Sequence, residues 1–352
     1  MEIRVTGIDN PLGLDGFAFC EFTSPDPAAM AAQFEQLGFV AAARVEARGL
    51  TLYRQGRTAF VLNSGGGHAE RFRAEHGPSA NGMAFHVANA ADAHANALQR
   101  GAKAADTSES ALPGAFAIEG IGGALLYLVE ADPFASWEEV EGWKEKAAEA
   151  SVGLDLLDHL THNVRRGQMG VWSTFYGRIF GFEEQKYFDI KGKATGLFSQ
   201  AMIAPDRAIR IPLNESQDDK SQIEEFIKDY NGEGIQHIAL STDDIYETVE
   251  KLRSRGVRLQ DTIETYYELV DKRVPGHGED LERLRGNRIL IDGDVENEGI
   301  LLQIFTENMF GPIFFEIIQR KGNEGFGNGN FQALFESIEL DQIRRGVIKV
   351  EA

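Results

Sequence analysis

Residues 234–256 read GIQHIALSTDDIYETVEKLRSRG, and residues 81–101 repeat the same order with NGMAFHVANAADAHANALQRG. Each stretch starts with a short apolar run, which predicts a buried strand, and continues into a helix-forming segment that ends at glycine. A strand and a helix in the same order in both halves of the chain indicate an internal repeat. This repeat decides the fold that we predict.

The repeat extends in both directions along the chain. LGLDGFAFCEF near the start corresponds to LDLLDHLTHNV at residues 154–164, and GGALLYLVE at residues 122–130 corresponds to GPIFFEIIQ at residues 311–319. We therefore predict an α+β fold of two related modules, built from paired βαβββ units with curved mixed sheets that form half-open barrels. The predicted modules are residues 1–150 and 151–352, joined by the acidic, helix-forming segment 132–153.

The composition restricts the class of protein and its partners. The chain has 352 residues, of which 43% are hydrophobic and 26% charged, as in ordinary globular proteins. It contains no apolar run of membrane-spanning length, and MEIRVTGIDN lacks a signal-peptide pattern, so we expect a cytoplasmic protein without a membrane partner. A single cysteine, Cys20, excludes internal disulfides, and a net charge of -20 argues against nucleic acid as a partner.

The two modules differ where the second carries His159, His237 and Glu316. These residue types can bind a metal together, and the residues aligned with them in the first module cannot. We therefore expect the chemistry in the second module and no metal in the first. In the same order, the aligned residues are Gly16, Phe85 and Tyr127.

Glu316 lies in the apolar run IFFEII, where an ionised carboxylate needs a positively charged partner. An arginine or lysine is one candidate, and a metal shared with His159 and His237 is the other. Strand alternation in a curved sheet allows the three side chains to point inward together. Two imidazoles and one carboxylate are typical of non-haem iron(II) oxygenases, although the same ligands also bind catalytic zinc.

The other histidines are predicted to have no role in this site. His162 and His86 would face away from the barrel interior, so we interpret them as structural or surface residues. The remaining four are predicted to be solvated in loops or on an exposed helix. These are His68, His76, His94 and His277.

Several polar residues interrupt the apolar pattern of the second module, which indicates a cavity for a small, oriented polar ligand. They are Ser199, Asn214, Gln222, Gln236 and Gln303. Phe326 and Phe331 in the glycine-rich stretch EGFGNGNF would supply flat apolar walls. Residues 331–345 form a predicted amphipathic helix whose apolar face ends at Gln342, and this helix is either a plain docking helix or a lid over the cavity.

The second half resembles the bacterial-type 4-hydroxyphenylpyruvate dioxygenases of the vicinal oxygen chelate superfamily. The resemblance is specific from Asp158 to Gly346 and looser in the first module. It rests on LLDHLTHNV, RIPLNE, GEGIQHIAL, LLQIF, FFEIIQRKGNEGFGNGNF and LFESIELDQIRRG. It implies one iron(II) per chain, bound by His159, His237 and Glu316, and a C-terminal helix with Gln342 that closes the cavity. The implied substrate pocket comprises Ser199, Asn214, Gln222, Gln236, Gln303, Phe326 and Phe331.

The implied reaction converts 4-hydroxyphenylpyruvate and dioxygen to homogentisate and carbon dioxide in tyrosine breakdown, through decarboxylation, ring hydroxylation and side-chain migration. The absence of a dinucleotide fingerprint agrees with a reaction in which the substrate supplies the electrons. Two alternatives stay open, namely a 4-hydroxymandelate synthase and a metal-free small-molecule-binding module of the same fold. We also expect a homo-oligomer, either a dimer or a tetramer.

Overall fold

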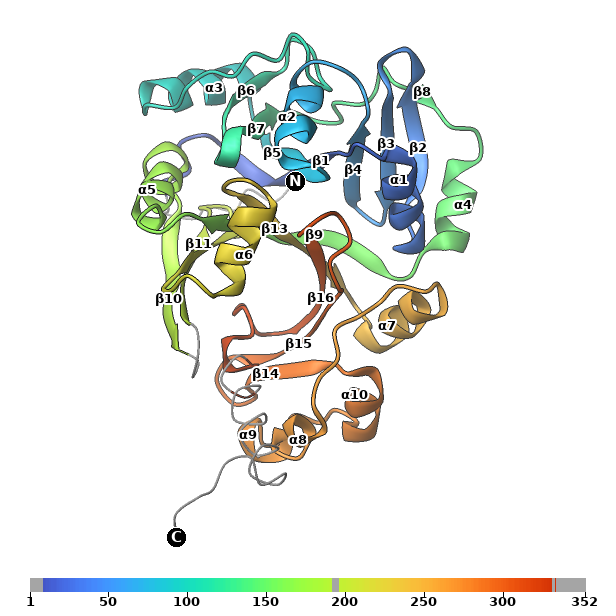
Figure 1. Cartoon of the computed structure of the whole chain (residues 1–352), viewed down its shortest axis with the longest axis vertical. Helices are drawn as coiled ribbons and strands as arrows, with labels where there is room; N and C mark the ends of the chain where they lie inside the picture. The colour runs from blue at the N-terminus through green and yellow to red at the C-terminus, as the bar shows by residue number, and fades with distance from the viewer. Residues whose placement is uncertain (1–8, 192–195, 331–332, 334–352) are drawn as a thin grey trace.

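The computed structural model describes residues 9–191, 196–330 and 333, and it contains one eight-stranded mixed sheet in each half of the chain (Figure 1). The strands of the first sheet are β1 (Leu14–Thr23), β2 (Val40–Val45), β3 (Leu50–Gln55), β4 (Thr58–Asn63), β5 (Ser79–Val87), β6 (Phe116–Glu119), β7 (Leu125–Val129) and β8 (Glu138–Glu139). The strands of the second are β9 (Leu154–Val164), β10 (Glu183–Lys191), β11 (Gly196–Ile203), β12 (Arg210–Ser216), β13 (Gly234–Thr242), β14 (Leu290–Asp294), β15 (Gly299–Phe305) and β16 (Phe314–Lys321).

Helices flank both sheets, as Figure 1 shows. The first half contains α1 (Pro27–Gln36), α2 (His68–His76), α3 (Ala90–Gln99), α4 (Trp143–Ala150) and the short 3₁₀ turns η1 (Glu46–Arg48) and η2 (Ile121–Gly123). The second half contains α5 (Met169–Phe180), α6 (Gln222–Asp229), α7 (Ile245–Ser254), α8 (Glu264–Tyr267), α9 (Val270–Arg273) and α10 (Leu281–Asn287). None of the helices in the described ranges is long and apolar enough to span a membrane.

The two sheets have the same topology, which confirms the predicted fold class. The strand order β6-β7-β5-β1-β4-β3-β2 in the first sheet matches β15-β16-β13-β9-β12-β11-β10 in the second, with β8 and β14 added at opposite edges. The helices α3 and α7, which follow the matching strands β5 and β13, also start alike. Asn89 accepts a hydrogen bond from the amide of Asp92, and Asp244 accepts one from the amide of Glu247, so each supplies the side-chain cap that a helix start requires.

The modules share one core, to which β16 and the segment before it contribute aromatic side chains. Phe315 contacts the ring of Phe60 from the first module, with 6.0 Å between ring centroids, and Phe310 packs edge-to-face on Phe22 and Phe34. The opposite face of β16 carries Glu316 into the interior of the second barrel. Because this core is continuous, the assignment of residues 1–150 and 151–352 to separate domains stays a prediction.

The sheet register corrects the sequence alignment of the two modules. In the second sheet, one row across β9, β13 and β16 contains His159, Ala239 and Glu316. The row at the same place in the first sheet contains Phe19, Ala84 and Tyr127.

The counterpart of His159 is therefore Phe19 and not Gly16. His237 lies two residues before Ala239 on β13, so its counterpart is Gly82, two residues before Ala84 on β5, and not Phe85. The predicted match between Glu316 and Tyr127 agrees with the register. The register shifts of β1 and β9 fall at equivalent places, so the error lies in the offset chosen between short and weakly similar motifs.

Polar side chains fill the first barrel at positions that match the interior of the second. The carboxylate of Glu21 is fully buried and accepts hydrogen bonds from Asn63 and Asn81, both at 2.7 Å, and from the hydroxyl of Tyr127 at 2.8 Å. Gly82 makes room for this network, since a Cβ atom there would lie 3.2 Å from the ring of Tyr127.

The histidine predictions hold in part. His162 is buried on the outer face of the sheet, and its Nε2 lies 2.7 Å from the hydroxyl of Tyr176, as expected for a structural residue. The prediction of solvated side chains is wrong for His76, which stacks on Tyr230 at the module interface, and for His277, whose side chain is 6% exposed. His76 is ordered by a residue far along the chain, which local sequence does not reveal, whereas His277 contacts its near neighbours Asp271 and Glu279.

Acid should destabilise the fold through His162, because burial lowers its pKa to about 3. Between the ordinary value near 6.5 and that value, the unfolded chain binds more protons than the folded one, so this contribution is complete above about pH 6.5 and is lost as pH falls. We expect wild type to lose about 2 kcal/mol more than His162→Gln between pH 7 and pH 5. Urea unfolding of both proteins at both pH values measures this, and equal losses would contradict the assignment.

Candidate metal centre

Three side chains that lay far apart in the sequence converge inside the second barrel. His159 comes from β9, His237 from β13 and Glu316 from β16, and these strands are neighbours in the sheet. The Oε2 atom of Glu316 lies 3.2 Å from Nε2 of His159 and 3.5 Å from Nε2 of His237. One possible ligand atom from each residue lies within 4.8 Å of the others, so a single cation can contact all three.

Each imidazole is held from behind by a hydrogen-bond acceptor. Nδ1 of His159 lies 2.8 Å from Oδ1 of Asp158, and Nδ1 of His237 lies 3.0 Å from Oε1 of Gln236. An acceptor at Nδ1 places the proton there and leaves the Nε2 lone pair for a metal. The hydroxyl of Thr161 lies 2.9 Å from Nε2 of His237 on the cavity side.

Two register shifts place these acceptors. The strand pairing of β9 and β13 is interrupted at Asp158 and again at Gln236, so each of these residues is the extra residue of a bulge. Strict alternation would have directed both side chains away from the neighbouring histidine. For the same reason, Leu157 does not share a face with His159, although it lies two residues before it, and belongs to the core shared by the modules.

The surroundings of Glu316 fit a metal better than an ion pair with arginine or lysine. Among the residues that the structure describes, its ion-pair partners are the two imidazoles. Its Oε1 atom is buried and makes no hydrogen bond to a described residue. Arg320, four residues along the same strand, pairs with Asp158 instead. A buried carboxylate with an unpaired oxygen between two available nitrogens is a suitable ligand set for a divalent cation.

The charges of the three residues are strongly linked. Burial opposes ionisation of Glu316, but His159 and His237 outweigh it and lower the pKa of Glu316 to about 2. Burial also disfavours the charged form of His159, yet Glu316 and Asp158 outweigh it and raise the pKa of His159. Burial lowers the pKa of His237. A proton on His159 and a divalent cation bound by the three side chains would therefore both favour the ionised form of Glu316, so the two compete for the site.

A cavity of about 320 Å³ adjoins the three residues. Most of the predicted substrate residues line it together with the three candidate ligands: Ser199, Asn214, Gln222, Gln236, Gln303 and Phe326. The other two, Phe331 and Gln342, lie outside the described residues, as does nearly all of the predicted C-terminal helix.

Polar groups in the cavity are of two kinds. Ser199 and Asn214 are neighbours across β11 and β12, and like Gln222 they make no side-chain hydrogen bond to any described residue. Gln303 is instead fixed, because its Oε1 accepts a hydrogen bond from Asn330. Gln303 also requires glycine at residue 327, where a Cβ atom would lie 1.5 Å from its Oε1.

Sequence reasoning missed several polar lining residues. Thr161 lies two residues after His159 on the same face of β9, and alternation would have found it. The others come from irregular segments and a helix end, where no period indicates which side chains face inward. They are Gln260, Asp261, Thr262, Arg288 and Asn328.

The chain is similar to known dioxygenases over nearly its whole length. Residues 8–139 match the family model described as hydroxyphenylpyruvate dioxygenase, N-terminal, and residues 156–269 match the glyoxalase, bleomycin resistance protein and dioxygenase superfamily. The 4-hydroxyphenylpyruvate dioxygenase of Pseudomonas aeruginosa is 57% identical, over 96% of this chain and 97% of that protein. The same enzyme of Legionella pneumophila is 50% identical, over 97% of this chain and 98% of that protein.

A solved structure of a triple mutant of 4-hydroxymandelate synthase from Streptomyces coelicolor has a TM-score of 0.80 and 27% identity. The matched region covers 94% of this chain and 100% of the synthase chain.

Replacement of Glu316 separates metal binding from ordinary burial of a carboxylate. With iron(II) at 100 times its Kd, bound metal adds about 2.7 kcal/mol to wild-type stability, and Glu316→Gln should lose most of that addition. The stability difference between wild type and variant should therefore shrink when a chelator is present.

Thermal unfolding of both proteins with iron(II) and with chelator measures this difference. Glu21→Gln is the matched control, since Glu21 is an equally buried strand carboxylate with protein partners only among the described residues. Its effect on stability should be the same in both solutions. A Glu316→Gln difference that persists unchanged in chelator would mean that Glu316 is no metal ligand.

Proposed function

The chain belongs to the 4-hydroxyphenylpyruvate dioxygenase family, and we propose that it oxidises 4-hydroxyphenylpyruvate with dioxygen to homogentisate and carbon dioxide at His159, His237 and Glu316. The observation that supports this most directly is the convergence of two Nε2 atoms and one carboxylate oxygen beside a cavity with unpaired polar groups. We assign one iron(II) ion per chain to these ligands. When bound, iron(II) supplies the chelation of a 2-oxo acid and the redox chemistry that activates dioxygen.

The sheet register indicates how the substrate lies. Asn214 pairs with Asn163, which is four residues beyond His159 on β9, or about 13 Å along the strand at about 3.3 Å per residue. Ser199 is the partner of Asn214 on the next strand. With the oxo acid at the metal ligands, these two side chains are placed to hydrogen-bond the phenol hydroxyl at the far end.

The first barrel supports the same orientation. Tyr127, the counterpart of Glu316, directs its phenol ring along the interior to Glu21, which is bonded to Asn63. Asn63 directly follows Leu62, the residue that pairs with Phe22. In the second sheet Asn214 directly follows Leu213, which pairs with His162, so the two asparagines occupy equivalent places. A phenol therefore already occupies the corresponding path in the first module.

Aromatic rings shield the metal ligands from water. Phe326 meets the ring of His159 edge-to-face at 5.3 Å, and Phe314 stacks on His237 at 4.9 Å. We propose that Phe331 and Gln342 complete this enclosure as part of a lid, which is supported by the family resemblance and by the position of Asn328 at the cavity wall.

The proposed partners are one aryl pyruvate and dioxygen, in a cytoplasmic homo-oligomer that is a dimer or a tetramer. The buried free thiol of Cys20 is consistent with a reducing compartment. The oligomeric state rests on the family resemblance.

Product analysis separates the proposed function from 4-hydroxymandelate synthesis. Iron(II)-loaded enzyme with air and 4-hydroxyphenylpyruvate should form homogentisate, which has three ring protons, where 4-hydroxymandelate keeps four. Mass and proton spectra identify the product, and a parallel reaction with chelator should form neither compound. The detection of 4-hydroxymandelate as the main product would overturn the assignment.

Asn214→Leu tests the phenol end of the cavity. Loss of one hydrogen bond to a buried hydroxyl costs about 1–3 kcal/mol, so kcat/KM for 4-hydroxyphenylpyruvate should fall roughly tenfold to a hundredfold. The value for phenylpyruvate, which lacks the hydroxyl, should change much less. Asn297→Leu, at an exposed asparagine between β14 and β15, is the control and should alter neither substrate. Equal losses for both substrates in Asn214→Leu would contradict the orientation.

A further inference from the structure

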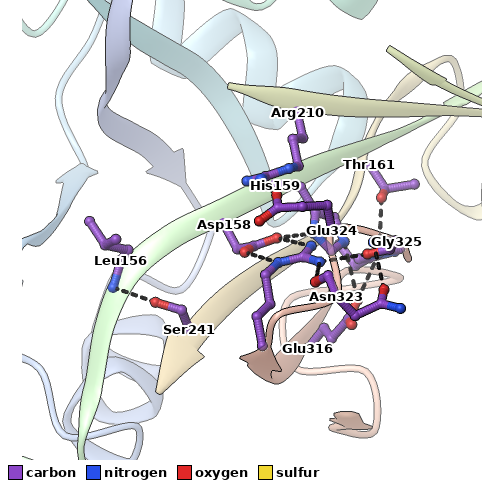
Figure 2. Close-up of polar contacts among 12 residues, drawn as sticks. Leu156, Asp158, His159, Thr161, Arg210, Ser241, Glu316, Asn323, Glu324 and Gly325 are labelled. Carbon is purple, nitrogen blue, oxygen red and sulfur yellow. Dashed lines mark hydrogen bonds and ion pairs between the residues drawn. The ribbon is translucent and has the colours of Figure 1, made fainter. Parts of the chain in front are cut away.

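Arg320 follows Glu316 on β16 and reaches two different parts of the site with one guanidinium group. Nε and Nη2 donate to the two carboxylate oxygens of Asp158, each at 2.8 Å. Nη1 donates to the backbone carbonyls of Asn323 at 2.9 Å and Gly325 at 2.6 Å. Figure 2 shows Asp158, Asn323 and Gly325 gathered beside Glu316. The Arg320 side chain is 14% exposed and that of Asp158 is 6% exposed, so these are interior contacts.

The first contact of Arg320 leads to the candidate metal ligand. Oδ1 of Asp158 accepts two hydrogen bonds, one from Nη2 of Arg320 and one from Nδ1 of His159. The bidentate pair prevents this carboxylate from rotating, and the carboxylate in turn fixes the plane of the imidazole. The orientation of His159 therefore depends on a residue that does not touch it.

The second contact leads to the cavity wall. Gly325 is held on both sides, by Arg320 at its carbonyl and by the side chain of Asn323 at its amide, 2.7 Å away. Phe326 comes next in the chain and packs on His159. The guanidinium of Arg320 also lies 5.9 Å from the centre of the Phe326 ring.

We propose that Arg320 is a positioning residue that sets the metal ligand His159 and the aromatic wall Phe326 as one unit. The proposal rests on the proposed function, because it takes His159 to bind the metal. Only arginine can hold both at once, since its planar fork has donors in three directions, whereas the ammonium group of lysine keeps a charge beside Asp158 but cannot also span both carbonyls. Binding of substrate against Phe326 and binding of metal by His159 are thereby linked.

The test uses full-length protein stripped of metal, with cobalt(II) alone as an anaerobic spectroscopic probe. Cobalt(II) affinity is measured by competition with a chromophoric chelator, and kcat and KM are then measured with saturating iron(II). Asp158→Asn should weaken cobalt(II) affinity about 10-fold to 100-fold, because it removes the charge behind His159. Arg320→Lys keeps a positive charge beside Asp158, so its cobalt(II) affinity should stay closer to wild type, while KM rises about tenfold through loss of the loop contacts.

Asp155→Asn is the matched control. Asp155 lies on the same strand and pairs with Arg57, away from the metal centre. It should leave cobalt(II) affinity, the cobalt(II) spectrum and KM at wild-type values, whereas a structural role alone would make Asp158→Asn and Arg320→Lys alter cobalt(II) affinity and KM together.

Wild-type cobalt(II) affinity in Asp158→Asn, or wild-type KM in Arg320→Lys, would overturn the proposal while leaving the proposed function intact. Failure of wild type itself to bind cobalt(II) or iron(II) would overturn both. Should Asp158→Asn not fold, the KM of Arg320→Lys decides alone, since that variant keeps both charges of the pair.

Discussion

An ionised carboxylate inside a strand that is buried on both faces requires positive charge beside it, and the second module is organised around this requirement of Glu316. One face of β16 packs through Phe315 on the first module, while the other directs Glu316 toward two imidazoles. An unpaired buried carboxylate would cost several kcal/mol. The histidines, the acceptors behind them and the cavity beside them are consistent with a site that a divalent cation completes.

Much of this arrangement follows from periodicity, and the rest does not. Alternation along IFFEII separates Phe315 and Ile317, which join the shared core, from Glu316, so the inward direction of the carboxylate was predictable. The repeat in the sequence predicted two related sheets. The acceptors Asp158 and Gln236 were not predictable as such, because each occupies a bulge, and a bulge depends on pairing with another strand.

The cavity shows the same division. Polar residues within strands, such as Asn214 and Gln303, were recognisable because they interrupt an apolar pattern. Arg288 lies just after a short helix and has a positive φ of 59°, so no period relates it to the cavity that it lines. The arginine at the end of β16 appeared in the sequence only as one charge in a glycine-rich stretch. Its importance comes from contacts with Asp158 and the carbonyl of Gly325, which are 162 and 5 residues away.

The occupied interior of the first barrel has a consequence for how the molecule unfolds. Tyr127 and Glu21 fill that interior with groups of the chain itself, so it needs no ligand from solution to fill it. The second barrel encloses a cavity whose contents come from outside and whose central charges balance best with a cation. Depletion of ligand and metal should therefore loosen the second barrel first, as a local opening event. The first barrel, whose interior is filled by its own side chains, should keep its structure under the same conditions.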